Sequence, residues 1–142
     1  MDWCPYLPRM NSTPSLLDEL SWRGMVYQYT DGLADALAMG ELTGYAGFDP
    51  TAPSLHVGSL VPVMGLAHLQ RAGHRPIAVV GGGTGMIGDP SGKMAERQLA
   101  SPEEVERNTR ALEKQLERFL DFTGPKAARM RDNAVWLRPL GA

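Results

Sequence analysis

The sequence has little that would support a disulfide framework, a thiolate metal site or a membrane anchor. Its 142 residues include one cysteine, Cys4, which excludes a network of disulfides and a zinc site built from several thiols. No apolar run reaches the ~20 residues that span a bilayer, and the first residues lack the basic-then-apolar pattern of a signal peptide. A net charge of −2 gives no general attraction for nucleic acid. These absences favour a cytoplasmic protein without membrane contact.

The composition is that of a folded domain. Apolar residues make up 43% of the chain and charged residues 21%, and 142 residues fit one ordinary domain. Residues 1–14 contain three prolines and no periodic pattern, so we expect an irregular tail there. Residues 15–142 are expected to form the folded part.

Turn signals and apolar periodicity divide residues 15–142 into alternating helices and strands. Ser15 is expected to cap a first short helix, and Asp31 to cap a second one that Gly40 closes. Further elements are expected at 43–48 (strand), about 57–72 (helix), 76–80 (strand), 101 onward (helix) and 133–137 (strand). The continuous apolar run at 76–80 predicts a strand that is buried on both faces.

Two of the predicted helices carry further signals. Pro62 is tolerated only in a first helical turn, so the helix near 57–72 should begin close to Gly58. The helix from 101 has a capping-box pattern, with proline at its first position, and an apolar stripe that we expect to continue to 120: Ser101, Pro102 and Glu104, then Val105, Leu112, Leu116, Phe119 and Leu120.

The order strand, helix, strand, helix, strand predicts an α/β fold. It is half of a Rossmann-like doubly wound parallel sheet, preceded here by the two short helices. Ligands of such sheets bind beyond the carboxyl ends of the strands. The loops at 47–56 and 81–93 should meet there, which makes them the candidate site.

The glycine-rich loop GGGTGMIG at 81–88 admits three interpretations. Gly83, Gly85 and Gly88 fit the dinucleotide-binding pattern, but DPSG follows where that motif requires a helix. A kinase-type phosphate loop fails because Gly88 and Gly92 are too close together and methionine follows the lysine. The remaining interpretation is a glycine-rich turn, which Asp89 could stabilise by bonding its own backbone.

The segment HVGS at 56–59 also admits a structural and a functional interpretation. It lies at a predicted helix N-terminus, where free amides and the helix dipole attract a phosphate that an imidazole could contact. Histidines at helix starts more commonly cap or pack, and Ser59 could be a simple N-cap.

Taken together, several stretches resemble the bacterial tyrosyl-tRNA synthetases, of class I. The likeness rests on YAGFDPTA at 45–52 leading to HVGS, and on the glycine loop leading through Lys93 to Glu96 and Arg97. Collinear support comes from LLDEL at 16–20, WRG at 22–24, AGHRP at 72–76 and FLDF at 119–122. The resemblance therefore runs from about residue 16 to the C-terminus and implies the N-terminal part of a catalytic domain.

The resemblance implies a tyrosine pocket. Tyr45 would hydrogen-bond the substrate phenol, Asp89 would pair with the ammonium group, and Thr84 would lie beside Asp89. A pocket that pairs with a hydroxyl rejects phenylalanine because a buried polar group would be left unpaired, a principle for which this enzyme family is itself the standard example.

The resemblance also implies an ATP site. Gly47, Asp49, Gly58 and Ser59 would line it, and the catalytic groups that hold the phosphates would be Thr51, His56, Lys93 and Arg97. HVGS matches the class signature His-x-Gly-His except that serine replaces the second histidine. The ribose contact of that histidine would therefore pass to a shorter hydroxyl or to water.

The family reaction activates tyrosine with ATP to tyrosyl-adenylate and then acylates tRNA(Tyr). Mg²⁺ is expected with the ATP substrate, no prosthetic group is expected, and the full-length enzyme is expected to be a homodimer. Holding the reactants in line and neutralising phosphate charge would supply the rate enhancement.

The chain ends before the second half of the sheet and the lysine-rich loop of the family, so we expect the 142-residue chain alone to be inactive. One alternative is a non-catalytic nucleotide-binding or interaction module derived from a synthetase. Another is the related tryptophan enzyme, which Tyr45 and the run at 47–52 disfavour.

Overall fold

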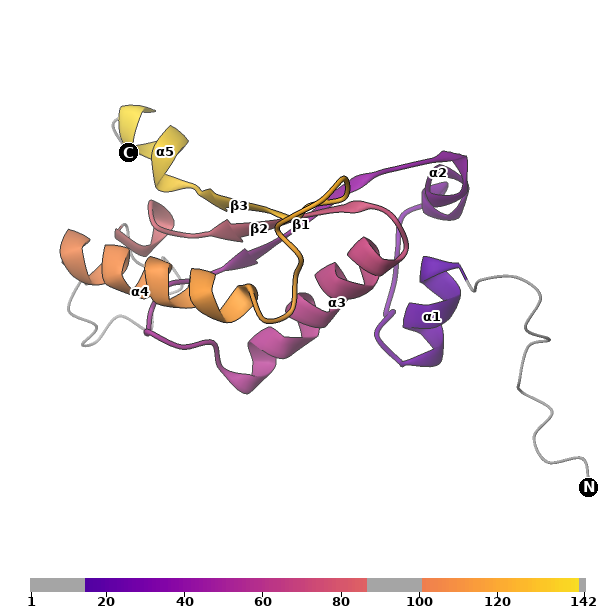
Figure 1. Ribbon diagram of the computed structural model, residues 1–142, viewed down its shortest axis with the longest axis horizontal. Helices are drawn as coiled ribbons and strands as arrows, with labels where there is room; N and C mark the ends of the chain where they lie inside the picture. Colours follow the sequence, from indigo (N-terminus) through magenta and orange to yellow (C-terminus); the bar gives the residue numbers. More distant parts are fainter. Residues whose placement is uncertain (1–14, 87–100, 141–142) are drawn as a thin grey trace, which may run out of the picture. The chain divides into compact units, whose positions relative to one another are not determined.

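The computed structural model describes residues 15–86 and 101–140. By its contacts the chain divides into two units, Met1–Gly40 and Glu41–Ala142, which are taken in turn. Figure 1 labels their helices and strands.

The first unit contains two seven-residue helices, α1 (Leu16–Trp22) and α2 (Leu33–Met39). The predicted cap of α1 is confirmed, because the Ser15 hydroxyl accepts the Asp18 backbone N–H at 3.2 Å. The predicted cap of α2 is wrong: the N-cap is Gly32, in the left-handed region at φ 80°, and it offers no side-chain acceptor. A glycine accepts that conformation without strain, so the chain turns one residue later than Asp31. Gly40 closes α2 as expected.

The second unit is built on a three-stranded parallel sheet in the order β1 (Thr43–Phe48), β2 (Arg75–Val80), β3 (Arg129–Asp132). Helix α3 (Leu60–Arg71) connects β1 to β2, and α4 (Pro102–Leu116) lies between β2 and β3 in the chain. Both helices lie on the same face of the sheet (Figure 1), as right-handed crossovers require. The predicted βαβαβ half-sheet is confirmed.

The register of the sheet brings the ends of the strands level with one another. Phe48 is paired with Val80, and Val80 with Asp132, in one row across the sheet. The segments that follow these three residues therefore leave the sheet at the same edge. This edge is the carboxyl edge, where the sequence places the candidate site.

The core lies between the sheet and its two helices. Its buried members are Phe48, Val63, Leu66, Ala67, Ala78, Val80, Leu112, Leu116, Leu120 and Ala128. In β2 buried and partly buried residues alternate, so the prediction of a strand buried on both faces is wrong. The crossover helices cover the face that carries Ala78 and Val80, while Ile77 and Val79 point to the other face and are half-buried.

The last strand lies earlier than the sequence suggests. Residues 133–137, expected as a strand, begin the helical turn α5 (Ala134–Leu137), which the 3₁₀ turn η3 (Arg138–Leu140) follows. Local hydrogen bonds explain the difference, because the Asp132 carboxylate accepts the Ala134 N–H at 2.9 Å and the Asn133 carbonyl accepts the Leu137 N–H at 3.0 Å. Those amides are thereby unavailable to a neighbouring strand.

The boundaries of the two long helices follow their proline signals. A 3₁₀ turn, η1 (Val57–Ser59), precedes α3, and Pro62 is the third residue of α3, within its first turn as expected. In α4 the hydroxyl of Ser101 accepts the Glu104 N–H at 3.2 Å, and Pro102 is the first helical residue. The helix ends at Leu116, so the predicted stripe does not continue to Phe119, which lies beyond the helix and is exposed.

Candidate active site

The loops that follow β1 and β2 touch each other at the carboxyl edge of the sheet. Gly81, the first residue after β2, donates its N–H to the Phe48 carbonyl at 2.9 Å. A Cβ at position 81 would lie 2.6 Å from the Thr84 hydroxyl and 3.0 Å from a carboxylate oxygen of Asp49. Glycine is therefore required at 81, and the loops after β1 and β2 meet at this edge as the sequence predicts.

Tyr45 and Gly47 face open space from the side of β1 opposite α3. A Cβ on Gly44 would lie 2.7 Å from Leu69 of α3, so the alternate residues of the strand point away from that helix. Tyr45 is 77% exposed. A Cβ on Gly47 would meet nothing within 4 Å, and its φ is not in the left-handed region. Among the described residues, neither a close neighbour nor a left-handed backbone requires a glycine at 47.

The glycine loop is held by a pair of side chains from the end of β3 that the sequence analysis missed. The Gly82 N–H donates to the Asp132 carboxylate at 3.1 Å, and the Gly83 N–H donates to the Asn133 side-chain oxygen at 2.7 Å. The Asn133 amide also donates to the Thr84 hydroxyl at 3.2 Å. The loop after β2 is thus fixed from the end of the adjacent strand.

A signal for this pair was present in the sequence. Asp132 and Asn133 form a polar pair directly before an apolar run, as expected for a strand end. The strand expected at 133–137 includes Asn133 and separates it from Asp132, which hides this signal. Once β3 ends at Asp132, the ends of the three strands lie along one edge.

His56 lies at the entrance to α3, with its ring over a glycine. A Cβ on Gly58 would lie 3.0 Å from both Cε1 and Nδ1 of the His56 ring, so a larger residue there would press on the imidazole. Ser59 occupies the N-cap position of α3, but its side chain makes no capping hydrogen bond. Ser59 is thus an N-cap by position, as the structural interpretation has it, but without a capping bond from its hydroxyl.

The remaining predicted site residues divide into two groups. Thr51 lies exposed on the loop that follows β1. Asp89, Lys93 and Arg97 lie outside the described residues. Within residues 15–86 and 101–140, no three His, Cys, Asp or Glu side chains come close enough to hold a metal ion. None of the helices in those ranges is long and apolar enough to cross a membrane.

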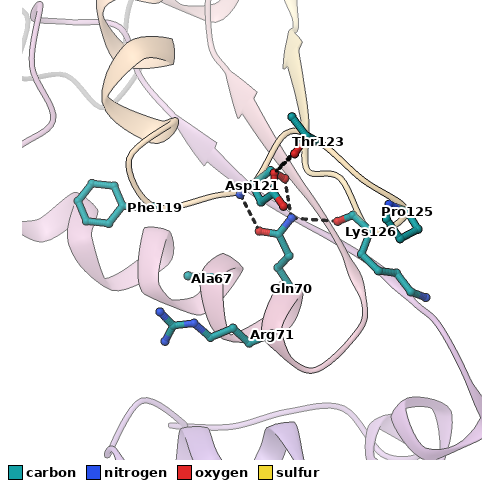
Figure 2. A pocket seen from close by; sticks show the side chains of 8 residues that line it. All are labelled: Ala67, Gln70, Arg71, Phe119, Asp121, Thr123, Pro125 and Lys126. Atoms are coloured by element: carbon teal, nitrogen blue, oxygen red, sulfur yellow. Dashed lines mark hydrogen bonds between the residues drawn. The ribbon is translucent and has the colours of Figure 1, made fainter.

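A hollow of about 360 Å³ opens at the other edge of the sheet, between the end of α3 and the segment 119–126 (Figure 2). Several of its polar groups bond to one another: the Gln70 amide bonds the backbone of Asp121 and Lys126, and the Asp121 carboxylate accepts from Thr123. The Thr123 hydroxyl and then its N–H lower the pKa of Asp121. These bonds join the end of α3 to the segment that leads to β3, at the amino ends of the strands and away from the candidate site.

A second hollow, of about 380 Å³, lies at the carboxyl edge beside the glycine-loop contacts. It is lined by Val105 and Glu106 of α4 and by residues of the β3–η3 region, Asp132, Ala134, Val135, Arg138 and Pro139. It therefore adjoins the candidate site from the side of β3.

Comparison with known proteins gives one matching family and many similar chains. Residues 38–140 match the family described as tRNA synthetases class I (W and Y). The chain is 59% identical over 127 residues to a tyrosine–tRNA ligase of Anaeromyxobacter dehalogenans strain 2CP-1, covering 89% of this chain and 30% of the relative. It is 58% identical over 128 residues to that of Desulfosudis oleivorans, covering 89% and 29%. The chain thus spans about 30% of the length of these relatives.

Solved structures share the fold. A C-terminally truncated mitochondrial tyrosyl-tRNA synthetase of Aspergillus nidulans superposes with a TM-score of 0.75 at 26% identity, covering 90% of this chain and 40% of that one. The corresponding Coccidioides posadasii structure gives a TM-score of 0.71 at 28% identity, covering 89% and 37%.

Proposed function

The chain belongs to the class I tRNA synthetases (W and Y), and from this premise we propose that it is the N-terminal part of the catalytic domain of a tyrosine–tRNA ligase. The parent enzyme would join tyrosine to tRNA(Tyr) in the cytoplasm, in protein synthesis, and would act as a homodimer. The identity of 58–59% to tyrosine–tRNA ligases favours this function over a non-catalytic module and over a tryptophan enzyme.

The observation that carries the proposal is the open position at Gly47. An unoccupied space in front of a strand glycine, beside Tyr45 and at the edge where Asp49 meets Thr84, suits a flat or phosphorylated ligand lying against the backbone. The Tyr45 phenol would bond the substrate hydroxyl. Asp89 would bind the ammonium group.

The Thr84 hydroxyl already makes two hydrogen bonds within the protein. It donates to the Gly81 carbonyl at 3.2 Å and accepts from Asn133. We therefore propose that Thr84 shapes the tyrosine pocket through the loop backbone. Its remaining lone pair could still accept a bond from substrate.

ATP would lie across the ends of β1 and α3. Gly47 and Asp49 would border the nucleotide, Gly58 and Ser59 its ribose side, and Thr51 and His56 the phosphates. The described part of the site holds carboxylates at 49 and 132, so neutralising a triphosphate would fall to Lys93, Arg97 and a Mg²⁺ ion brought with the ATP.

The chemistry needs no protein nucleophile. An oxygen of the tyrosine carboxylate would attack the α-phosphorus of ATP, the bond to the β-phosphate oxygen would break, and pyrophosphate would leave. A ribose hydroxyl at the 3′ end of tRNA would then displace AMP from the adenylate. Positioning and charge neutralisation would supply the rate enhancement.

An ATP–pyrophosphate exchange assay on the full-length gene product tests this function. We expect exchange that depends on tyrosine and is much weaker with tryptophan or phenylalanine. The 142-residue chain alone, assayed beside it, should be inactive. Exchange driven by tryptophan, or no amino-acid-dependent exchange by the full-length product, would contradict the proposal.

A further inference from the structure

The loop between β1 and α3, which carries Thr51 and ends at His56, is tied to helix α4 by two side-chain amides. Asn108 donates to the Pro50 carbonyl at 3.0 Å, and Asn108 itself is buried. Gln115 accepts the Leu55 N–H at 3.1 Å and donates to the Pro53 carbonyl at 3.0 Å. Asn108 and Gln115 are seven residues apart, two helical turns, so both lie on one side of α4.

We propose that Asn108 and Gln115 are positioning residues, which fix the loop so that Thr51 and His56 are held in place for the phosphates of ATP. The inference rests on the function proposed above and adds to it two residues far along the chain. Neither belongs to the candidate site, and neither was expected from the sequence to affect it.

The loop depends on outside partners because of its own sequence. Residues 49–56 form neither helix nor strand, so regular hydrogen bonding does not fix their path. Pro50 and Pro53 have no N–H to offer, which limits the bonds that the loop can form within itself. Their carbonyls are the two that α4 binds, at the residues on either side of Thr51 and Ala52. Thr51 is thus held from both sides.

The Gln115 side chain bonds the backbone at the end of the loop as a neighbouring strand would. By accepting the N–H of Leu55 and donating to the carbonyl of Pro53, it bonds one donor and one acceptor of the same short segment. Leu55 is the residue immediately before His56, and it packs against the core. Fixing the Leu55 backbone therefore fixes the position of the His56 backbone, which carries the imidazole, and of η1 after it.

The same molecule contains a matched control, at the opposite edge of the sheet. Gln70 of α3 accepts the Asp121 N–H at 3.0 Å and donates to the carbonyls of Asp121 and Lys126 at 2.7 and 2.9 Å (Figure 2). It has the same chemistry as Gln115, and it holds a connection that leads to β3 at the amino edge. Replacing Gln70 should cost similar stability without moving Thr51 or His56.

The test compares Gln115→Ala, Asn108→Ala and Gln70→Ala in the full-length gene product, with kcat and KM for ATP and for tyrosine in pyrophosphate exchange. Misplacing reacting groups by about 1 Å costs on the order of 100-fold in rate. We expect kcat to fall about 10- to 100-fold in Gln115→Ala and Asn108→Ala, with little change in the KM for tyrosine. Gln70→Ala should keep a kcat close to that of the wild type.

A conservative variant, together with amide hydrogen exchange, distinguishes a positioning role from a general loss of stability. Gln115→Glu keeps an acceptor for the Leu55 N–H but loses the donor to Pro53, so its kcat should lie between those of the wild type and Gln115→Ala. Amide hydrogen exchange at Leu55 should be faster in Gln115→Ala and unchanged in Gln70→Ala.

Equal losses of kcat in the Gln70 and Gln115 variants, or wild-type kcat in Gln115→Ala, would overturn the positioning role while leaving the proposed function intact. A wild-type protein without tyrosine-dependent exchange would overturn the function and the positioning role with it. In that case faster exchange at the Leu55 amide would still report the structural contact.

Discussion

Replacing Gly47 by alanine should change folding and ligand binding in opposite directions. Among the residues that the structure describes, a Cβ at 47 meets nothing within 4 Å, and the backbone is not in the left-handed region, so that part of the protein has room for the methyl group. Glycine inside a strand costs about 0.5–1 kcal/mol relative to alanine. The free energy of unfolding should therefore rise slightly.

Binding of ATP should weaken because the added methyl occupies the space proposed for the nucleotide. An extra methyl in a filled contact costs about 1–3 kcal/mol, which corresponds to roughly a 5- to 150-fold loss of affinity. Urea denaturation and calorimetric titration with ATP, on the same preparation of the full-length gene product, would measure both effects.

Gly65→Ala provides the matched control. Gly65 lies inside α3, its added Cβ also meets nothing within 4 Å, and the strand edge is not involved. It should gain stability in the same way and bind ATP as the wild type does. Unchanged ATP affinity in Gly47→Ala would show that the nucleotide does not lie against Gly47, and a large loss of stability would show that the protein has no room for the methyl group.

Three further substitutions test other parts of the account. Asn133→Ala leaves the Gly83 N–H of the loop unpaired and removes the bond to the Thr84 hydroxyl, so the free energy of unfolding measured in urea should fall by about 1–3 kcal/mol. An unchanged value would contradict the role of Asn133 in fixing the loop. Thr109→Val removes a buried hydroxyl that has no partner among the described residues, so stability should rise by about 1 kcal/mol, and a loss would show that the hydroxyl is bonded. Thr123 lowers the pKa of Asp121 below its ordinary 3.8, so the carboxylate stabilises the fold above that pH and the benefit disappears as pH falls through the folded pKa. Relative to Asp121→Asn, the wild type should therefore lose its advantage in urea unfolding below pH 3.8, and an advantage independent of pH would contradict this origin.

The sequence predicted those features that local chemistry determines. The strand at 43–48, the cap at Ser15, the position of Pro62 in its helix and the meeting of the two strand-end loops were all confirmed. Each depends on neighbouring residues or on the parallel order of the strands. Such features can be read before any contact between distant segments is known.

The wrong predictions concern segments where a second structure competes with the one that the local pattern favours. The apolar residues 134–137 suit a strand, but the Asp132 carboxylate and the Asn133 carbonyl take their amides into a helical turn. Gly32 rather than Asp31 is the N-cap of α2 because glycine accepts a left-handed turn. Helix and strand are close alternatives for short apolar runs.

The hydrogen bonds that fix the site lie beyond any local pattern. Asp132 and Asn133 reach the glycine loop across 50 residues, and Gln115 reaches Leu55 across 60. Only the crossover geometry of α4 and the register of β3 bring these groups together. The roles proposed for Asp89, Lys93 and Arg97 stay predictions, since those residues lie outside the described part of the chain.

A crystal structure of the full-length gene product with a non-hydrolysable tyrosyl-adenylate analogue would show whether the ligand binds at the carboxyl edge of the sheet. The analogue should lie across the carboxyl ends of β1 and β2 and against the backbone of Gly47. Its phenol should contact Tyr45, and its phosphate should point toward Thr51 and His56. An analogue bound elsewhere, or one that left the space in front of Gly47 empty, would contradict the account.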